Sequence, residues 1–222
     1  MKITNNNLKY FDNLIDFNDF LMKTYQHVEG YFQRYGDRES HSLEHTIRVA
    51  NTCFDLAQHL GATIDVLLVS AIFHDVGRPM EENTGECHAE ISAEIASSFL
   101  KEHALNEMVH EVVENIRSHR FSKGIQPTTK EGKILKDADA LDALGAIGIY
   151  RTIIFSLEKG YNLNKAVEHF YEKLFKLSEL MHFPLTKQIA EKETKLMHLF
   201  VDEITDDMQK SKFITLTDRI KN

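Results

Sequence analysis

An apolar run over residues 66–73 ends in the dipeptide His74-Asp75, and this junction limits the folds open to the chain. The run predicts a buried segment, and Gly77 and Pro79 predict that a helix ends there. Adjacent His and Asp side chains offer one nitrogen and one carboxylate oxygen to the same cation. The sequence therefore predicts a buried helix that carries metal ligands to the mouth of a cavity.

The rest of the chain has helical periodicity nearly throughout. Only three of its 222 residues are proline, and none of them interrupts a long periodic segment. The sequence shows no strand alternation, no internal repeat and no linker long enough to divide domains. It predicts an all-α, single globular bundle over residues 1–222, with a core of about 25–205, an N-terminal flanking helix and a C-terminal surface helix. The predicted helices cover residues 11–34, 43–60, 63–75, 88–103, 106–119, 131–143, 145–158, 163–178 and 185–210.

Charge and composition exclude several classes of function. The net charge of −8 argues against extended nucleic-acid binding, which needs a basic face, but a small anionic substrate needs only a local basic cluster. The longest apolar run, about eight residues, is too short to span a membrane. The N-terminus has no apolar signal core and the two cysteines lack CxxC spacing, so we expect a cytoplasmic protein. The charged final helix leaves a homodimer open.

Two side chains far from the dipeptide complete a candidate metal site. His45 shares a predicted helix face with Val49, and a lone histidine there is more often a core residue satisfied by one hydrogen bond. Its position ahead of a second histidine-bearing helix favours a ligand instead. Asp139 lies among Ala and Leu, where a carboxylate is costly to bury unless it is paired or metal-bound. The predicted metal ligands are His45, His74, Asp75 and Asp139.

Such a mixed nitrogen and oxygen set suits Mn²⁺, Fe²⁺, Co²⁺, Ni²⁺ or Zn²⁺ better than Mg²⁺. His88 and His119 lie at the ends of predicted helices, where they are a second metal site, phosphate contacts or simple polar caps. Asp142 is a candidate to orient a ligand histidine. Asp75 and Asp142 are also candidates to accept a proton, and His119 is a candidate to protonate a leaving group. Candidate substrate contacts, each with the plain alternative of a solvated surface residue, are Arg78, Lys136, Arg151 and His41.

The order His45, His74-Asp75, Asp139 resembles the H…HD…D signature of the HD-domain superfamily of metal-dependent phosphohydrolases. Within it the chain is similar to the YedJ/YpgQ-like bacterial subfamily. Members of that subfamily often have Gly-His-Asp ahead of the first ligand, whereas this chain has Ser40-His41-Ser42, so the role of His41 stays open. The segments that carry the likeness are residues 45–49, 71–78, 88–96 and 134–148, within a similarity over about 25–205.

The resemblance implies an all-helical HD domain that hydrolyses a phosphorylated substrate. A nucleotide is expected, and hydrolysis of a nucleoside triphosphate to monophosphate and pyrophosphate is favoured. His88 and His119 resemble the extra histidines that bind a second metal in binuclear HD proteins, although in other relatives such histidines contact phosphate. Two alternatives stay open: a metal-dependent nucleotide-binding module without turnover, and a di-iron HD-fold oxygenase.

Overall fold

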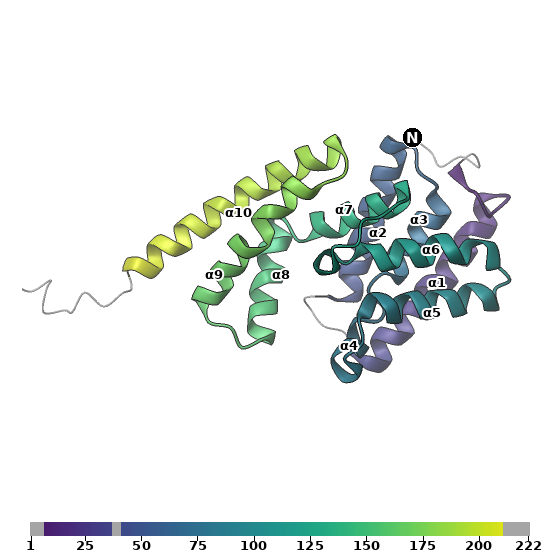
Figure 1. Cartoon of the computed structure of the whole chain (residues 1–222), viewed down its shortest axis with the longest axis horizontal. Coiled ribbons are helices and arrows are strands. Elements are labelled where there is room, and N and C mark those ends of the chain that lie inside the picture. The colour runs from purple at the N-terminus through teal and green to yellow at the C-terminus, as the bar shows by residue number, and fades with distance from the viewer. Residues whose placement is uncertain (1–6, 37–40, 211–222) are drawn as a thin grey trace, which may run out of the picture. The chain divides into compact units, whose positions relative to one another are not determined.

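The computed structural model describes residues 7–36 and 41–210, and its regular elements in these ranges are helices (Figure 1), which confirms the all-α prediction. The chain divides into two compact units, Met1–Asp142 and Ala143–Asn222. That they act as a single domain stays a prediction. Residues 1–6 and 211–222, at the ends of the predicted domain, lie outside the described residues.

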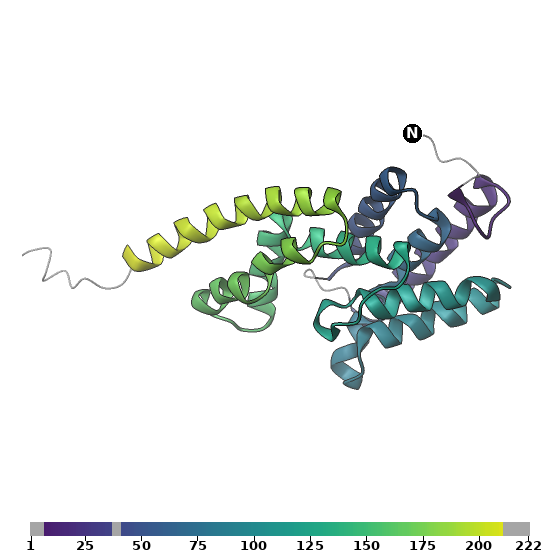
Figure 2. The same ribbon diagram turned by 45° about the horizontal axis from the view of Figure 1, so that its top comes forward.

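The first unit is built around helix α3 (Ile64–Phe73). All ten of its residues are buried, as expected for a helix that is apolar on every side. It packs against five other helices of the unit, among them α5 and α6, which run side by side in both views (Figures 1 and 2). The other elements are α1 (Leu14–Tyr35), α2 (Leu43–Leu60), α4 (Arg78–Thr84), α5 (His88–Glu102), α6 (Asn106–His119), the 3-10 helix η2 (Phe121–Lys123) and α7 (Lys130–Asp142).

The predicted end of the third helix was wrong. Helix α3 ends at Phe73, residues 74–77 form a turn, and Arg78 begins α4, which the sequence analysis did not predict. Pro79 lies in the first turn of α4. A proline there starts a helix rather than stopping one, because its missing N–H has no helical partner at that position. The dipeptide His74-Asp75 is therefore held in a short turn between two helices.

A buried polar chain joins α3, α6 and α7. The Asn115 side chain donates to Ser70 Oγ at 3.2 Å, and Asn115 Oδ1 accepts from Thr129 Oγ1 at 2.6 Å. Thr129 Oγ1 in turn accepts from the backbone N–H of Gly132 at 2.8 Å, which caps the start of α7. Buried polar groups are stable when each has a partner, so this chain fixes the three helices relative to one another.

The second unit comprises α8 (Gly145–Glu158), α9 (Leu163–Glu172), the 3-10 helix η3 (Leu174–Leu180) and α10 (Pro184–Lys210). Helix α10 packs on the other three elements, and Phe170, Met197 and Val201 are fully or almost fully buried. The predicted helix over 163–178 is thus an α-helix followed by a 3-10 helix. Among the described residues no single helix is long and apolar enough to cross a membrane; α7 and α8 meet that test only when taken together.

Gly77 provides a test of how closely the turn packs on α5. A Cβ atom at Gly77 would lie 2.5 Å from the carbonyl oxygen of His88 and 2.9 Å from Cβ of Ile91. We expect Gly77→Ala to lower the free energy of unfolding by about 1–3 kcal/mol in urea denaturation, since the turn or α5 must shift. The control is Gly30→Ala in α1, where a Cβ meets nothing within 4 Å among the described residues. It should stabilise by about 0.5–1 kcal/mol. Unchanged stability of Gly77→Ala would contradict the packing.

Candidate metal centre

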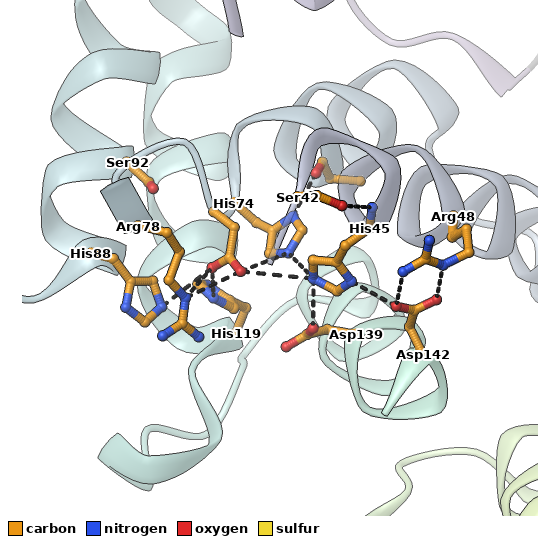
Figure 3. A network of polar contacts seen from close by, with 12 residues as sticks. Ser42, His45, Arg48, His74, Arg78, His88, Ser92, His119, Asp139 and Asp142 are labelled. Atoms are coloured by element: carbon orange, nitrogen blue, oxygen red, sulfur yellow. Dashed lines mark hydrogen bonds and ion pairs between the residues drawn. The ribbon is translucent and has the colours of Figure 1, made fainter. Parts of the chain in front are cut away.

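Four histidines meet where α2, α5, α6 and the turn after α3 approach one another (Figure 3). His45 comes from α2 and His74 from the turn, while His88 begins α5 and His119 ends α6, as the sequence predicted for the latter two. Each of the four is at most 1% exposed. Burial of four imidazoles at one point requires a partner for their ring nitrogens.

Two of the rings are held by backbone carbonyls three residues earlier in the chain. Nδ1 of His74 lies 2.6 Å from the carbonyl oxygen of Ala71, and Nδ1 of His119 lies 2.5 Å from that of Ile116. A carbonyl oxygen can only accept, so Nδ1 carries the hydrogen in both rings. Nε2 of each ring therefore keeps its lone pair.

The other two rings are held by carboxylates. Nδ1 of His45 lies 2.7 Å from Asp142 Oδ2, and Nδ1 of His88 lies 3.0 Å from Glu81 Oε2. These acceptors also place the hydrogen on Nδ1. Each of the four rings thus has Nδ1 bonded to an acceptor and Nε2 directed at the other donor atoms, as in a metal-ligating histidine backed by a second hydrogen bond.

The first group of donor atoms comprises His45, His74 and Asp139, which are close enough to share one cation. Nε2 of His45 lies 3.3 Å from Nε2 of His74 and 3.3 Å from Asp139 Oδ1. Oδ2 of Asp75 lies 3.7 Å from the first of these nitrogens and 3.8 Å from the second. The structure therefore brings together the four side chains that the sequence predicted as ligands.

The second group comprises Asp75, His88 and His119. Oδ1 of Asp75 lies 3.3 Å from Nε2 of His88 and 3.4 Å from Nε2 of His119. Both nitrogens are buried without a hydrogen-bond partner among the described residues. Orphaned buried nitrogens of this kind fit a missing cation. Asp75 offers one carboxylate oxygen to each group.

The pKa values of these residues favour the protonation states that bind metal. Burial lowers the pKa of His74 to about 4 and that of His88 to about 3, so both are neutral at neutral pH. Burial raises the pKa of Asp75, but the Arg78 guanidinium and the nearby histidines outweigh it and hold the pKa well below its usual range. For Asp139, burial is likewise outweighed by the hydrogen bond to His45, which lowers its pKa. Neutral imidazoles and ionised carboxylates are the ligand forms.

Asp142 supports the first group from the far side of the His45 ring. Its carboxylate accepts from Arg48 Nε at 2.7 Å and from Arg48 Nη2 at 3.0 Å, and Figure 3 shows this pair of contacts beside the His45 bond. Because both oxygens are engaged there, the geometry favours a role in orienting His45 over direct proton transfer. Sequence reasoning missed Arg48, although its place three residues after His45 puts both on one helix face.

The predicted substrate contacts are in different settings. Arg78 Nε donates to both oxygens of Asp75 at 3.2 Å, so it contacts the metal centre directly. The His41 ring lies edge-on to that of His45, with centroids 6.0 Å apart. Lys136 Nζ donates to the carbonyl oxygen of Ile125 at 2.6 Å. Arg151 lies on α8 in the second unit and is mostly buried. Their roles towards a substrate stay predictions.

Glu81 was not predicted, and it lies on the helix that sequence reasoning missed. It contacts the His88 ring, Arg78 and Arg120. Burial raises its pKa, but the charges and hydrogen bonds of His88, Arg120 and Arg78 outweigh that effect and lower the pKa. The only sequence signal was its place one turn after Arg78, which is visible once Pro79 is taken as a helix start.

Comparisons with known proteins show the family to which the chain belongs. A family model described as "HD domain" matches residues 42–144, the range that contains all six candidate ligands. The solved structure of a predicted HD superfamily hydrolase from an uncultured Thermotogales bacterium is 31% identical. That match covers 85% of this chain and 92% of the other, with a TM-score of 0.64. The chain belongs to the HD domain family. The predicted superfamily is thereby confirmed, and with it membership among the HD hydrolases.

Two further relatives of this HD protein are informative. YpgQ of Bacillus subtilis, a protein described as uncharacterized, is 26% identical over 181 residues, 78% of this chain and 86% of YpgQ. Its crystal structure in complex with ADP has the same fold, with a TM-score of 0.69 over 84% of this chain and 97% of the other at 23% identity. Ribonuclease Y of Treponema denticola is 27% identical over 173 residues, but the match spans only 32% of that enzyme.

The lowered pKa values of His74 and His88 predict how the metal-free protein responds to acid. The ordinary value for histidine is 6.5, and the folded-state value falls to about 4 for His74. Between these values the unfolded chain binds more protons than the folded chain. The stability that comes from keeping these histidines neutral is therefore fully present above about pH 6.5 and is lost as the pH falls towards about 4. Thermal unfolding in a chelator should show Tm falling over this window.

The matched variant for this test is His74→Asn, which keeps a donor for the Ala71 carbonyl but cannot titrate. It should be less stable overall and show a flatter dependence of Tm on pH between about 6.5 and about 4. A wild-type Tm that is constant across this window would contradict the neutral, buried state of the histidines.

Proposed function

We propose that this HD protein is a metal-dependent phosphohydrolase that acts on nucleotides, with cleavage of a nucleoside triphosphate to monophosphate and pyrophosphate favoured. The observation that carries the proposal is the position of Asp75 between two groups of histidine Nε2 atoms. Sites with two cations are common in enzymes that hydrolyse phosphate esters and anhydrides. The complex of the relative YpgQ with ADP supports a nucleotide ligand.

The donor sets define which residues would hold each cation. The first would be held by His45, His74, Asp139 and one oxygen of Asp75, and the second by the other oxygen of Asp75 with His88 and His119. When bound, divalent cations supply Lewis-acid activation of water and neutralise charge on phosphoryl oxygens.

The remaining residues divide the other tasks. The Asp139 side chain is 26% exposed and that of Asp75 only 2%, so Asp139 is the more accessible of the two to substrate and water. Asp139 is therefore the carboxylate best placed to accept a proton from a reacting water. Arg78 is 27% exposed and contacts Asp75 mainly through Nε, which leaves N–H groups of its guanidinium for phosphoryl oxygens.

His119 cannot serve both of its predicted roles. Nδ1 of His119 is bonded to the Ile116 carbonyl, so in the neutral ring the one hydrogen lies there and Nε2 has no proton to give to a leaving group. Holding the second cation and protonating the leaving group are therefore exclusive. The partner-free Nε2 favours the metal role, and the leaving group would then take its proton from water.

The same four histidines and two aspartates also suit a di-iron oxygenase, which is the second candidate function. Iron content with oxygen-dependent turnover would favour that alternative. Release of phosphate or pyrophosphate without oxygen would reject it.

The direct test is an anaerobic activity screen with Mn²⁺, Co²⁺, Ni²⁺ or Mg²⁺ against nucleoside mono-, di- and triphosphates. Pyrophosphate and phosphate are measured separately. We expect pyrophosphate release from triphosphates, strongest with the transition metals. Asp75→Ala should abolish it because it removes an oxygen from both donor groups. The control Asp55→Ala, at an exposed position on α2, should retain full activity.

Each other result has a defined meaning. Phosphate release from monophosphates would make the protein a nucleotidase, and the triphosphate assignment would be wrong. Nucleotide binding without turnover under any metal would overturn hydrolysis and favour the binding module.

A further inference from the structure

Glu81 contacts the outer side of the His88 ring and two arginines. Its Oε2 accepts from Nδ1 of His88 at 3.0 Å and from Arg78 Nη1 at 3.5 Å, and its Oε1 accepts from Arg120 Nη1. We propose that Glu81 is the positioning residue that makes the second cation site: it fixes His88 with Nε2 free and directed at Asp75. This inference rests on the proposed two-cation function and adds a determinant that acts on one of the two sites only.

Glu81 fixes the tautomer of His88. A carboxylate can only accept, so Glu81 holds the ring hydrogen on Nδ1. Nε2 then carries a lone pair, 3.3 Å from Asp75 Oδ1 and without a hydrogen-bond partner among the described residues. Without Glu81 the hydrogen is free to move to Nε2, where it would bond to Asp75 and remove the nitrogen as a ligand. A negative acceptor also makes the ring a stronger donor to metal.

The two donor groups have the same pattern of acceptors behind their histidines. In the first group, His45 is backed by Asp142, which is held by Arg48, while His74 is backed by a backbone carbonyl. In the second group, His88 is backed by a carboxylate that is held by arginines, while His119 is backed by a backbone carbonyl. Each group therefore has one carboxylate-backed histidine. Glu81 stands in the second group where Asp142 stands in the first.

Cys87 lies near Glu81 and His88. Ligand atoms of these three residues are close enough for a further cation. However, Arg120 Nη1 donates to Glu81 and also to Cys87 Sγ at 3.1 Å, so a guanidinium charge already lies against both of these acceptors. The arrangement is therefore a support for His88, with Arg120 holding Glu81 in place, and not a third metal site.

The test is titration of the full chain with Mn²⁺ alone, followed by calorimetry and by electron paramagnetic resonance. Wild type should bind two ions and give the signal of a coupled Mn²⁺ pair. Glu81→Gln should weaken the second binding step by about 10–100-fold, leave the first unchanged and give a single-ion signal. The matched control is Glu86→Gln, which makes the same charge change at an exposed position in the α4–α5 loop. It should behave as wild type.

A double variant separates positioning from general stability. Glu81→Gln should have no further effect on Mn²⁺ binding once His88→Ala is present, because Glu81 acts through that ring. Equal weakening of both binding steps by Glu81→Gln would indicate a general structural role and overturn the proposal. If wild type binds two ions and Glu81→Gln binds Mn²⁺ as wild type does, only the role of Glu81 is overturned. One ion in wild type would overturn the two-cation function and this inference with it.

Discussion

The ionised carboxylate of Asp75 is buried where helices of the first unit meet, and much of the surrounding structure offsets the cost of burying it. An isolated charge in such a place is strongly unfavourable unless it is paired. The Arg78 guanidinium places a full positive charge against it. Four histidines direct Nε2 atoms to within 3.8 Å of its two oxygens. Such an arrangement is stable and useful when cations are bound between these atoms.

The packing of the helices in the first unit positions the candidate ligands. An apolar helix, α3, is buried on all sides and ends directly before the turn that carries His74 and Asp75. Gly77 lets that turn approach the backbone of α5 at His88. The chain of bonds through Asn115 fixes α6 and α7 against α3, so that His119 and Asp139 approach the turn from their own helices. The candidate ligands thus lie on packed helices, apart from His74 and Asp75, which lie in the short turn.

Much of this could be read from the sequence. The order of His45, His74-Asp75 and Asp139 predicted one set of ligands, and the places of His88 and His119 at the ends of predicted helices made them further candidates. Helix α4 was missed because Pro79 permits either a stop or a start, and only tertiary packing decides between them. Glu81 was missed for the same reason. Lys136 and Arg151 were chosen for charge alone, and periodicity does not fix where long basic side chains end.

We propose that the two oxygens of Asp75 would each hold a different cation. Crystals grown with Mn²⁺ and measured at the manganese absorption edge would test it most directly, because anomalous scattering locates each ion without assumptions about the ligands. We expect two peaks, one on either side of the Asp75 carboxylate, about 3.5–4 Å apart. One peak should contact Nε2 of His45 and His74, and the other Nε2 of His88 and His119. A single peak bound by His45, His74 and Asp139, with His88 and His119 turned away from Asp75, would contradict it.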